Sequence, residues 1–357
     1  MKKQLFLLLL PITLFTLLLT SCSDKQSSFK LEKVAESDQL WTGVAASNDG
    51  RVFVNYPRWI PNIEYSVAEL KSDNEVIPYP DKKWNSFDGE NSPEDHFVCV
   101  QSVYIDDKGF LWVLDTGMLL GRGVIENGAK LIKINLETNE VIDKIFFDDT
   151  IAFGRCYLND VRVDTKNDFA FITDSGVGAV IVVNLDTKLS RRLLENHPST
   201  KAEDIVITIH GEAWLQRDSS KPQIHSDGIA LDKNNEFIYY QALTGHNLYR
   251  IPVDKLEDFS IVDTQLDQLV EHVIKSGPAD GIMFDRNNLL FLSSLDESAI
   301  RYIDENGNII VAYKSVDLEW PDSFSITANG DIYFTDSKLN KAYQPDVKYI
   351  VYKLVRE

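Results

Sequence analysis

The stretch ADGIMFDRNNLLFLSS, from Ala279 to Ser294, carries the pattern that determines the fold. Two apolar runs flank the polar segment DRNN, and this arrangement predicts a β-hairpin with a tight turn. The Asp-Gly pair at Asp280 and Gly281 stands before the first apolar run, not between the two runs. Asp-Gly is ordinarily a turn signal, so its position at the start of a strand suggests a different role.

The same pattern recurs along the chain at intervals of roughly 40 to 70 residues, a spacing typical of repeat architectures. Each copy begins with a polar residue, followed by an apolar strand, a turn and a second strand. The six copies are WTGVAASNDGRVFVNY, VQSVYIDDKGFLWVLD, LNDVRVDTKNDFAFITD, SDGIALDKNNEFIYYQ, ADGIMFDRNNLLFLSS and WPDSFSITANGDIYFTD. The polar residues at their starts, called the ring residues below, are Thr42, Gln101, Asn159, Asp227, Asp280 and Asp322.

Six units of about four strands each predict an all-β chain folded as a six-bladed β-propeller over residues 29–357. Further short strands, LIKINL, AVIVVNL, HNLYRIPV and AIRYID, lie between the copies. Two stacked β-sandwiches would not produce one six-fold motif at this spacing. Helical patterning is scarce, with short candidates near Glu64–Leu70 and Thr264–Ile274.

Closure of the ring is also predicted from the two ends of this region. The last copy leaves room for one more strand, KYIVYKLV, from Lys348 to Val355. The segment FKLEKVA, from Phe29 to Ala35, is then expected to complete the same sheet as its outer strand.

Composition restricts the class of partner. The chain has 357 residues and a formal net charge of -19, with acidic residues spread along its length. Nucleic acid is excluded as a partner because no basic stripe is present to neutralise phosphates. A cationic or neutral small molecule fits the charge better, although many of the carboxylates serve only solubility. We expect a monomer.

The N-terminus has the features of a bacterial lipoprotein signal. Lys2 and Lys3 precede the apolar run LFLLLLPITLFTLLL, which ends at Leu19-Thr20-Ser21-Cys22. This order of charged, apolar and small residues indicates a signal peptide over residues 1–21. Cys22 is the predicted lipidation site, and residues 22–28 form a short polar tether. We therefore expect an extracytoplasmic domain anchored by lipid to a bacterial membrane, at the outer membrane or cell surface.

Two further cysteines, Cys99 and Cys156, each precede a predicted inner strand. In an oxidising compartment they could form a disulfide. Two buried free thiols are an equal alternative.

The ring residues are the candidate site. The first strand of each propeller blade lines a central channel, so all six oxygen-bearing side chains should meet at one channel mouth. Three of them are carboxylates, which repel one another unless their pKa values rise or a cation binds. Oxygen ligands suit calcium or another divalent cation. The structural alternative is that Asp and Asn bond nearby backbone N–H groups, with Gly228 and Gly281 relieving crowding.

Other motifs indicate structure more than chemistry. Asp115, Asp174 and Asp336 recur at the ends of second strands and are expected to be turn caps. No histidine pairs with a Ser and an Asp in a nucleophile elbow. No glycine-rich phosphate loop or dinucleotide motif is present.

Several segments resemble the major royal jelly protein/Yellow family, in the same order along the chain. They are NYPRW (Asn55–Trp59), VQSVYIDDKGFLWVLDTGM (Val100–Met118), FITDSGVGAVIVVNLDT (Phe171–Thr187), His197-Pro198-Ser199, DGIALDKNNEFIYY (Asp227–Tyr240) and WPDSFSITANGDIYFT (Trp320–Thr335). The resemblance implies a six-bladed propeller. Insect members include proteins linked to dopachrome conversion, amine-binding salivary proteins and nutritive jelly proteins, so activity is implied only weakly.

A more distant resemblance is to gluconolactonase-like (SMP-30) propellers, in which a Glu, two Asn and an Asp hold a central divalent ion. LNDVRVD places Asn159 at a ligand position, and ADGIMFD places Asp280 at the position of ligand and catalytic base. Asp227 stands where the second Asn is found, and Thr42 stands where the Glu is found. The resemblance thus implies a metal site of Asn159, Asp227 and Asp280.

Three functions follow as hypotheses. The first is a lipid-anchored, Yellow-like propeller that binds a small amine or aromatic molecule at its channel. An extension of this hypothesis is that the protein also catalyses tautomerisation of the bound molecule. The second is a divalent-metal-dependent lactonase or related hydrolase, in which Asp280 accepts a proton. The third is a non-catalytic surface scaffold.

Overall fold

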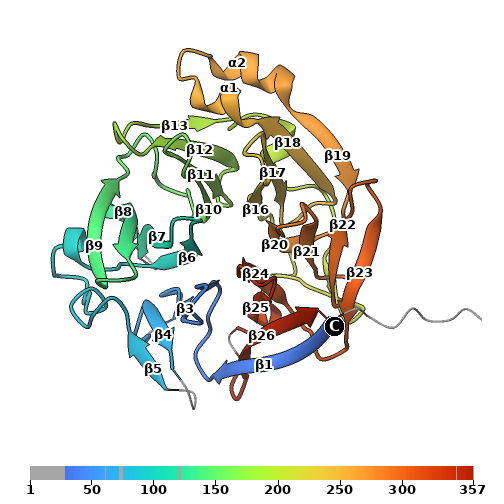
Figure 1. Ribbon diagram of the computed structural model, residues 1–357, viewed down its shortest axis with the longest axis horizontal. Coiled ribbons are helices and arrows are strands. Elements are labelled where there is room, and N and C mark those ends of the chain that lie inside the picture. Colours follow the sequence, from blue (N-terminus) through green and yellow to red (C-terminus); the bar gives the residue numbers. More distant parts are fainter. Residues whose placement is uncertain (1–28, 61, 72–74, 120–121, 343, 357) are drawn as a thin grey trace, which may run out of the picture.

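The computed structural model describes residues 29–60, 62–71, 75–119, 122–342 and 344–356. Six four-stranded antiparallel sheets are arranged around one central axis (Figure 1). The predicted all-β, six-bladed propeller is confirmed. The predicted signal peptide, Cys22 and the tether lie outside the described residues.

Each blade runs from an inner strand at the axis to an outer strand at the rim. Blades 1 and 2 are β2 (Val44–Ala46), β3 (Val52–Asn55), β4 (Val67–Leu70), β5 (Val76–Pro78), and β6 (Val100–Ile105), β7 (Phe110–Leu119), β8 (Gly123–Asn135), β9 (Glu140–Phe146). Blades 3 and 4 are β10 (Leu158–Asp164), β11 (Phe169–Asp174), β12 (Ala179–Asn184), β13 (Ser190–Leu193), and β16 (Ser226–Leu231), β17 (Phe237–Ala242), β18 (Asn247–Pro252), β19 (Glu271–Lys275). Blades 5 and 6 are β20 (Ala279–Phe284), β21 (Leu290–Ser294), β22 (Ala299–Ile303), β23 (Ile309–Lys314), and β24 (Pro321–Ile326), β25 (Ile332–Asp336), β26 (Tyr349–Arg356), β1 (Phe29–Ser37).

The hairpin turn in the opening stretch shows why DRNN separates two strands. The Asp285 carboxylate accepts hydrogen bonds from the backbone N–H groups of Asn287 (2.8 Å) and Leu289 (2.9 Å). Asn288 has φ of 61°, a left-handed conformation that Asn tolerates better than most residues. The turn chemistry therefore fixes the register of β20 against β21.

The core lies between neighbouring blades. In β7, Leu111, Trp112, Val113 and Leu114 are all buried, because both faces of the sheet are covered. Trp112 and Leu114 pack against blade 3, whereas Leu111 and Val113 pack against blade 1. Burial of each such side chain stabilises the fold by about 1.5–3 kcal/mol. This two-sided burial explains the continuous apolar runs in the sequence.

The ring closes where the two ends of the chain meet in blade 6 (Figure 1). β1 pairs antiparallel with β26, in a register that runs from Phe29 opposite Arg356 to Ser37 opposite Tyr349. The Phe29 ring packs edge-on against Phe291 of blade 5, with ring centroids 6.1 Å apart. The predicted closure is confirmed.

The helix expectations were only partly right. Within Glu64–Leu70, residues 67–70 form β4, a short strand buried on both faces, because packing between sheets outweighs local propensity. Within Thr264–Ile274, α2 (Asp263–Leu266) and a 3-10 turn (Asp267–Leu269) precede β19. Together with α1 (Val253–Glu257), α2 lies at the outer edge of blade 4 (Figure 1).

A long connection joins blades 3 and 4 and includes the small hairpin β14 (Thr208–Ile209) and β15 (Glu212–Ala213). Trp214 follows this hairpin and packs edge-on against Trp320, with ring centroids 4.6 Å apart. The contact places part of the connection near the axis, on the side where the inner strands begin.

Removal of β1 tests the closure. A chain that begins at Asp38 should unfold more easily than one that begins at Phe29, by at least about 3 kcal/mol, since strand pairing and the burial of Phe29 are lost. Thermal denaturation followed by circular dichroism measures the difference. Equal melting temperatures would show that β1 does not close the ring.

Candidate functional site

Five of the six ring residues line one cavity of about 370 Å³ at the axis. These five, from Gln101 to Asp322, stand at the starts of the inner strands β6, β10, β16, β20 and β24. Thr42 does not line the cavity. Its hydroxyl donates to the Gln101 carbonyl oxygen (3.1 Å) and accepts from the Asn55 amide (2.9 Å), so it joins blades 1 and 2.

The glycine after each of two ring aspartates allows the inner strands to approach closely. A Cβ atom at Gly228 would lie 2.3 Å from the Asp280 carbonyl oxygen. A Cβ atom at Gly281 would lie 2.2 Å from the Asp322 carbonyl oxygen. Any side chain at these positions would force the strands apart. The two glycines therefore allow the ring aspartates of three neighbouring blades, Asp227, Asp280 and Asp322, to come together at the cavity.

The three carboxyl groups form a buried cluster with few external donors. The side chain of Asp280 interacts with those of Asp227 and Asp322. Its Oδ2 also accepts a hydrogen bond from the Trp320 indole N–H (2.6 Å). Asp227 accepts from the Asn159 side-chain amide, and Asp322 accepts from the Ser337 hydroxyl.

Burial raises the pKa of each carboxyl group in this cluster. Burial is the main cause of an Asp280 pKa of about 7, with the Asp160 charge acting in the same direction. Burial and the charge of Asp280 raise the pKa values of Asp227 and Asp322 well above the ordinary range. The cluster therefore holds protons at neutral pH in the absence of a cation.

Aromatic side chains line the same cavity as the carboxyl cluster. The Trp59 indole N–H donates to the Tyr157 hydroxyl (2.6 Å), which donates to the Gln101 side-chain oxygen (2.8 Å). Trp59, Tyr157 and Trp214 all line the cavity. None of these three was identified from the sequence as a site residue. Trp59 lies in the NYPRW segment. Tyr157 lies two residues before Asn159, as Trp320 lies two residues before Asp322, but this aromatic position does not recur in all six blades.

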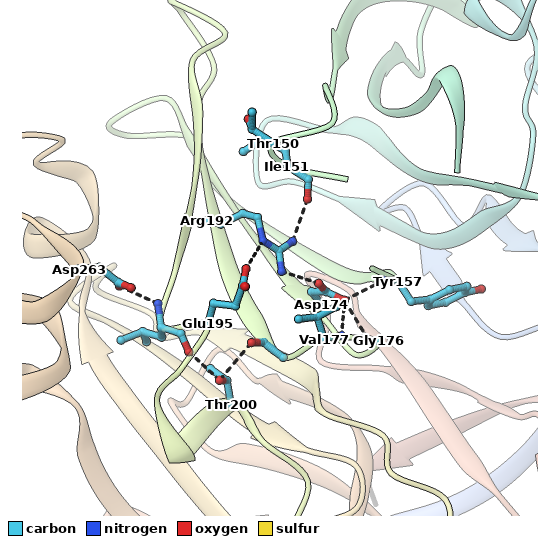
Figure 2. Close-up of polar contacts among 12 residues, drawn as sticks. Thr150, Ile151, Tyr157, Asp174, Gly176, Val177, Arg192, Glu195, Thr200 and Asp263 are labelled. Atoms are coloured by element: carbon cyan, nitrogen blue, oxygen red, sulfur yellow. Dashed lines mark hydrogen bonds and ion pairs between the residues drawn. The ribbon is translucent and has the colours of Figure 1, made fainter. Parts of the chain in front are cut away.

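A charged network behind the cavity positions Tyr157 (Figure 2). Asp174 accepts a hydrogen bond from the Tyr157 backbone N–H (2.8 Å). Its other carboxylate oxygen accepts from Arg192 (2.7 Å), which also donates to the Ile151 carbonyl oxygen (2.8 Å). The Tyr157 ring points away from this network (Figure 2), so its hydroxyl is free to reach Gln101.

The same cap occurs in two other blades, as expected for Asp115, Asp174 and Asp336. Asp115 accepts from the backbone N–H of Val98 (2.7 Å). Asp336 accepts from the backbone N–H of Trp320 (2.7 Å). Each aspartate thus holds the segment just before its blade's inner strand, and the predicted structural role is confirmed.

Cys99 and Cys156 are both free, buried thiols. Burial raises the pKa of Cys99 to about 11 and that of Cys156 to about 12. Of the two alternatives left open by the sequence, the structure contains the reduced pair.

The structure brings Asn159, Asp227 and Asp280, the predicted metal site, to one cavity. The Asn159 amide nitrogen faces the Asp227 carboxylate, so the amide oxygen is turned away from it. Thr42 is engaged elsewhere. Across the residues that the structure describes, no group of three or more His, Cys, Asp or Glu side chains could hold a metal ion. Calcium or another divalent cation at this site stays a prediction from the sequence.

Sequence comparison agrees with the geometry of the fold. Residues 98–354 match the family described as Major royal jelly protein. The chain belongs to the major royal jelly protein family. It is 23% identical to Major royal jelly protein 3 of Apis mellifera over 237 residues, which are 64% of this chain and 41% of that protein. Major royal jelly protein 6 of Apis mellifera is 23% identical over 62% of this chain and 50% of its own length.

The chain thus spans half or less of the length of these relatives. Among solved structures, a gluconolactonase from Xanthomonas campestris has the same fold, with a TM-score of 0.55 and 13% identity over 91% of this chain and 89% of that chain. At this identity the likeness concerns the fold alone.

The membrane anchor remains a sequence-based prediction for this family member, since Cys22 lies outside the described residues. Within the described ranges, no helix is long and apolar enough to cross a bilayer.

The raised pKa values predict a stability that depends on pH. The folded state holds more protons than the unfolded state once the pH exceeds the ordinary Asp value of 3.8, so the free energy of unfolding should fall as pH rises from about 4 through about 7. Asp227→Asn removes one carboxyl group and keeps the oxygen that accepts from Asn159. We expect this variant to exceed the wild type by about 1–3 kcal/mol at pH 8 and by less at pH 4.

Melting temperatures measured at intervals between pH 4 and pH 8 provide the test. The matched control is Asp168→Asn, at an exposed turn residue with φ of 58° that Asn adopts easily. The control should follow the wild-type curve. A parallel curve for Asp227→Asn would show that its carboxyl group titrates normally.

Proposed function

We propose that this protein binds a small aromatic amine in the cavity at the ring residues. The observation that carries the proposal is the combination of three buried carboxyl groups with walls of indole and phenol rings in one cavity. Its volume of about 370 Å³ lies at the lower end of the range for small-molecule sites.

The chemistry of the cavity complements an ammonium group. An ammonium beside Asp280 would lower the carboxyl pKa values and replace a shared proton, so binding would release protons. Trp59 and Trp214 line the cavity, and indole rings attract cations and stack against aromatic groups. Because the carboxyl groups must ionise, amine affinity should increase with pH until the cluster has lost its protons.

Amine binding can be measured by isothermal titration calorimetry with serotonin and dopamine at pH 6 and pH 8. We expect saturable binding that is tighter at pH 8. Asp280→Asn should weaken it by at least roughly tenfold, since a charge-assisted contact is lost. Glu305→Gln, at an exposed turn on the outside of blade 5, removes the same charge and should leave affinity unchanged.

The same titration method tests other ligands for this cavity. The anion 3,4-dihydroxyphenylacetate has the ring of dopamine without the amine and should not bind this cavity. Heat from calcium chloride that disappears in Asp280→Asn would favour the metal-dependent hydrolase instead. If no amine and no ion binds, the scaffold hypothesis gains and the proposal fails.

Proton transfer is a second candidate function, favoured by the pKa of Asp280. A carboxyl group with a pKa of about 7 can both accept and donate a proton near neutral pH. Tautomerisation needs only this, because a proton leaves one atom of the substrate and returns to another without oxidation or reduction.

Dopachrome conversion followed by absorbance tests this candidate. Asp280→Asn should lower kcat by at least roughly a hundredfold. Asp322→Asn leaves Asp280 in place and should retain most of the turnover. Equal kcat values for the two variants would remove Asp280 from the reaction.

A further inference from the structure

A second cavity, of about 270 Å³, lies at the opposite ends of the same inner strands. The first cavity is lined by the residues that begin these strands, and the second by residues near their ends, such as Ile105 of β6, Phe284 of β20 and Ile326 of β24. The two cavities share no lining residue. The second is therefore a separate site on the propeller axis.

Arg162 of β10 lines this cavity and is 5% exposed. Its terminal nitrogens donate to the carbonyl oxygens of Val161 (2.7 Å) and Ile282 (2.9 Å). Its Nε has no hydrogen-bond partner among the residues that the structure describes. A buried guanidinium donor without a hydrogen-bond partner costs free energy. The Nε of Arg162 therefore needs a partner that the surrounding residues do not supply.

The acidic group nearest to Arg162 is a poor counter-ion. Asp160 Oδ2 lies 3.8 Å from the Arg162 guanidinium. Burial raises the pKa of Asp160, and its other oxygen accepts a hydrogen bond from the Ser102 hydroxyl (3.0 Å). Among the described residues, the positive charge of Arg162 thus faces only this distant carboxyl group and the Tyr104 ring, whose centroid lies 5.3 Å from the guanidinium carbon.

Two further cations, Lys233 and Arg286, line the rim of the cavity and are exposed. In the described part of the chain, neither side chain forms an ion pair. Such uncommitted cations are notable in a chain with a net charge of -19.

The carboxylates at the same rim are occupied by local structure. Asp106 accepts from the backbone N–H of Phe110 (2.9 Å) and from the Trp112 indole (2.8 Å). Asp285 is the turn cap described above and also contacts Arg356 (3.3 Å). Asp107 accepts from the Thr165 hydroxyl. These contacts engage the acidic oxygens, whereas Lys233 and Arg286 are exposed and the Nε of Arg162 has no partner in the described part of the chain.

The walls between Arg162 and the rim are apolar. They include Val103, Leu231, Met283 and Phe324. A hydrocarbon or aromatic group gains free energy by entering such a space. Inorganic anions could not use these walls, so the walls favour an anion attached to an apolar body.

We propose that this second cavity binds a small carboxylic acid with an apolar body, whose carboxylate faces the Arg162 guanidinium. Arg forms short charge-assisted hydrogen bonds with carboxylates, and its planar donors match their geometry. Lys233 and Arg286 add electrostatic attraction at the rim. The proposal concerns a ligand of opposite charge, at a different site, from the amine proposed above.

Benzoate is the probe, titrated into the full described domain by isothermal titration calorimetry at pH 7 and low salt. We expect saturable binding with Kd below roughly 1 mM. Benzamide, which has the same shape without the charge, should give no saturable heat. Arg162→Lys should weaken benzoate binding by at least roughly tenfold, since the planar fork is lost.

A second variant, at the rim of the cavity, keeps the proposal testable if Arg162→Lys does not fold. Lys233→Gln combined with Arg286→Gln changes only exposed side chains and should weaken binding by at least roughly threefold. The matched control is Lys275→Gln combined with Lys314→Gln, which removes the same charge from the exposed outer strands β19 and β23.

The control should bind benzoate like the wild type, and serotonin binding should be unchanged in the rim variant. Absence of saturation by benzoate at 10 mM, on the order of ten times the expected Kd, would overturn the proposal. Equal affinities in the rim variant and its control would also overturn it.

Discussion

The pairing of β1 with β26 is the contact on which the rest of the structure depends, because it joins the start of the described chain to its end. Each blade buries both faces against its neighbours, so an open ring would leave two apolar faces exposed to water. Closure removes both faces at once. It also holds the six inner strands at a common axis, and both cavities arise from this arrangement.

The axis concentrates charge that the rest of the fold keeps apart. Gly228 and Gly281 allow neighbouring inner strands to approach, and the aspartates before them become a buried cluster. Such a cluster is unfavourable in its ionised form, since each charge loses water and faces like charges. The cluster is therefore stabilised by bound protons or by a cationic ligand. At the other end of the same strands, the positive charge of Arg162 favours an anionic ligand.

Repetition explains why much of the fold could be predicted. The turn contacts of DRNN act within one blade, and so do the capping aspartates Asp115, Asp174 and Asp336. Because each blade needs the same local contacts, the same residue types recur along the sequence. The convergence of five ring residues also follows from periodicity. Thr42 departs from it because its hydroxyl is used between blades 1 and 2, and Glu64–Leu70 departs because burial outweighs helical propensity.

By itself, the sequence determined the six-bladed propeller, the closing strand and the set of carboxylates at the axis, since each depends on a pattern that repeats or on local turn chemistry. Only the tertiary structure decided which side chains share a cavity. Trp59, Tyr157 and Trp214 reach the first cavity from three different connections, and Arg162 faces the second from one strand alone. Such contacts join residues far apart in the chain and occur once, so no periodic signal marks them before the ring closes.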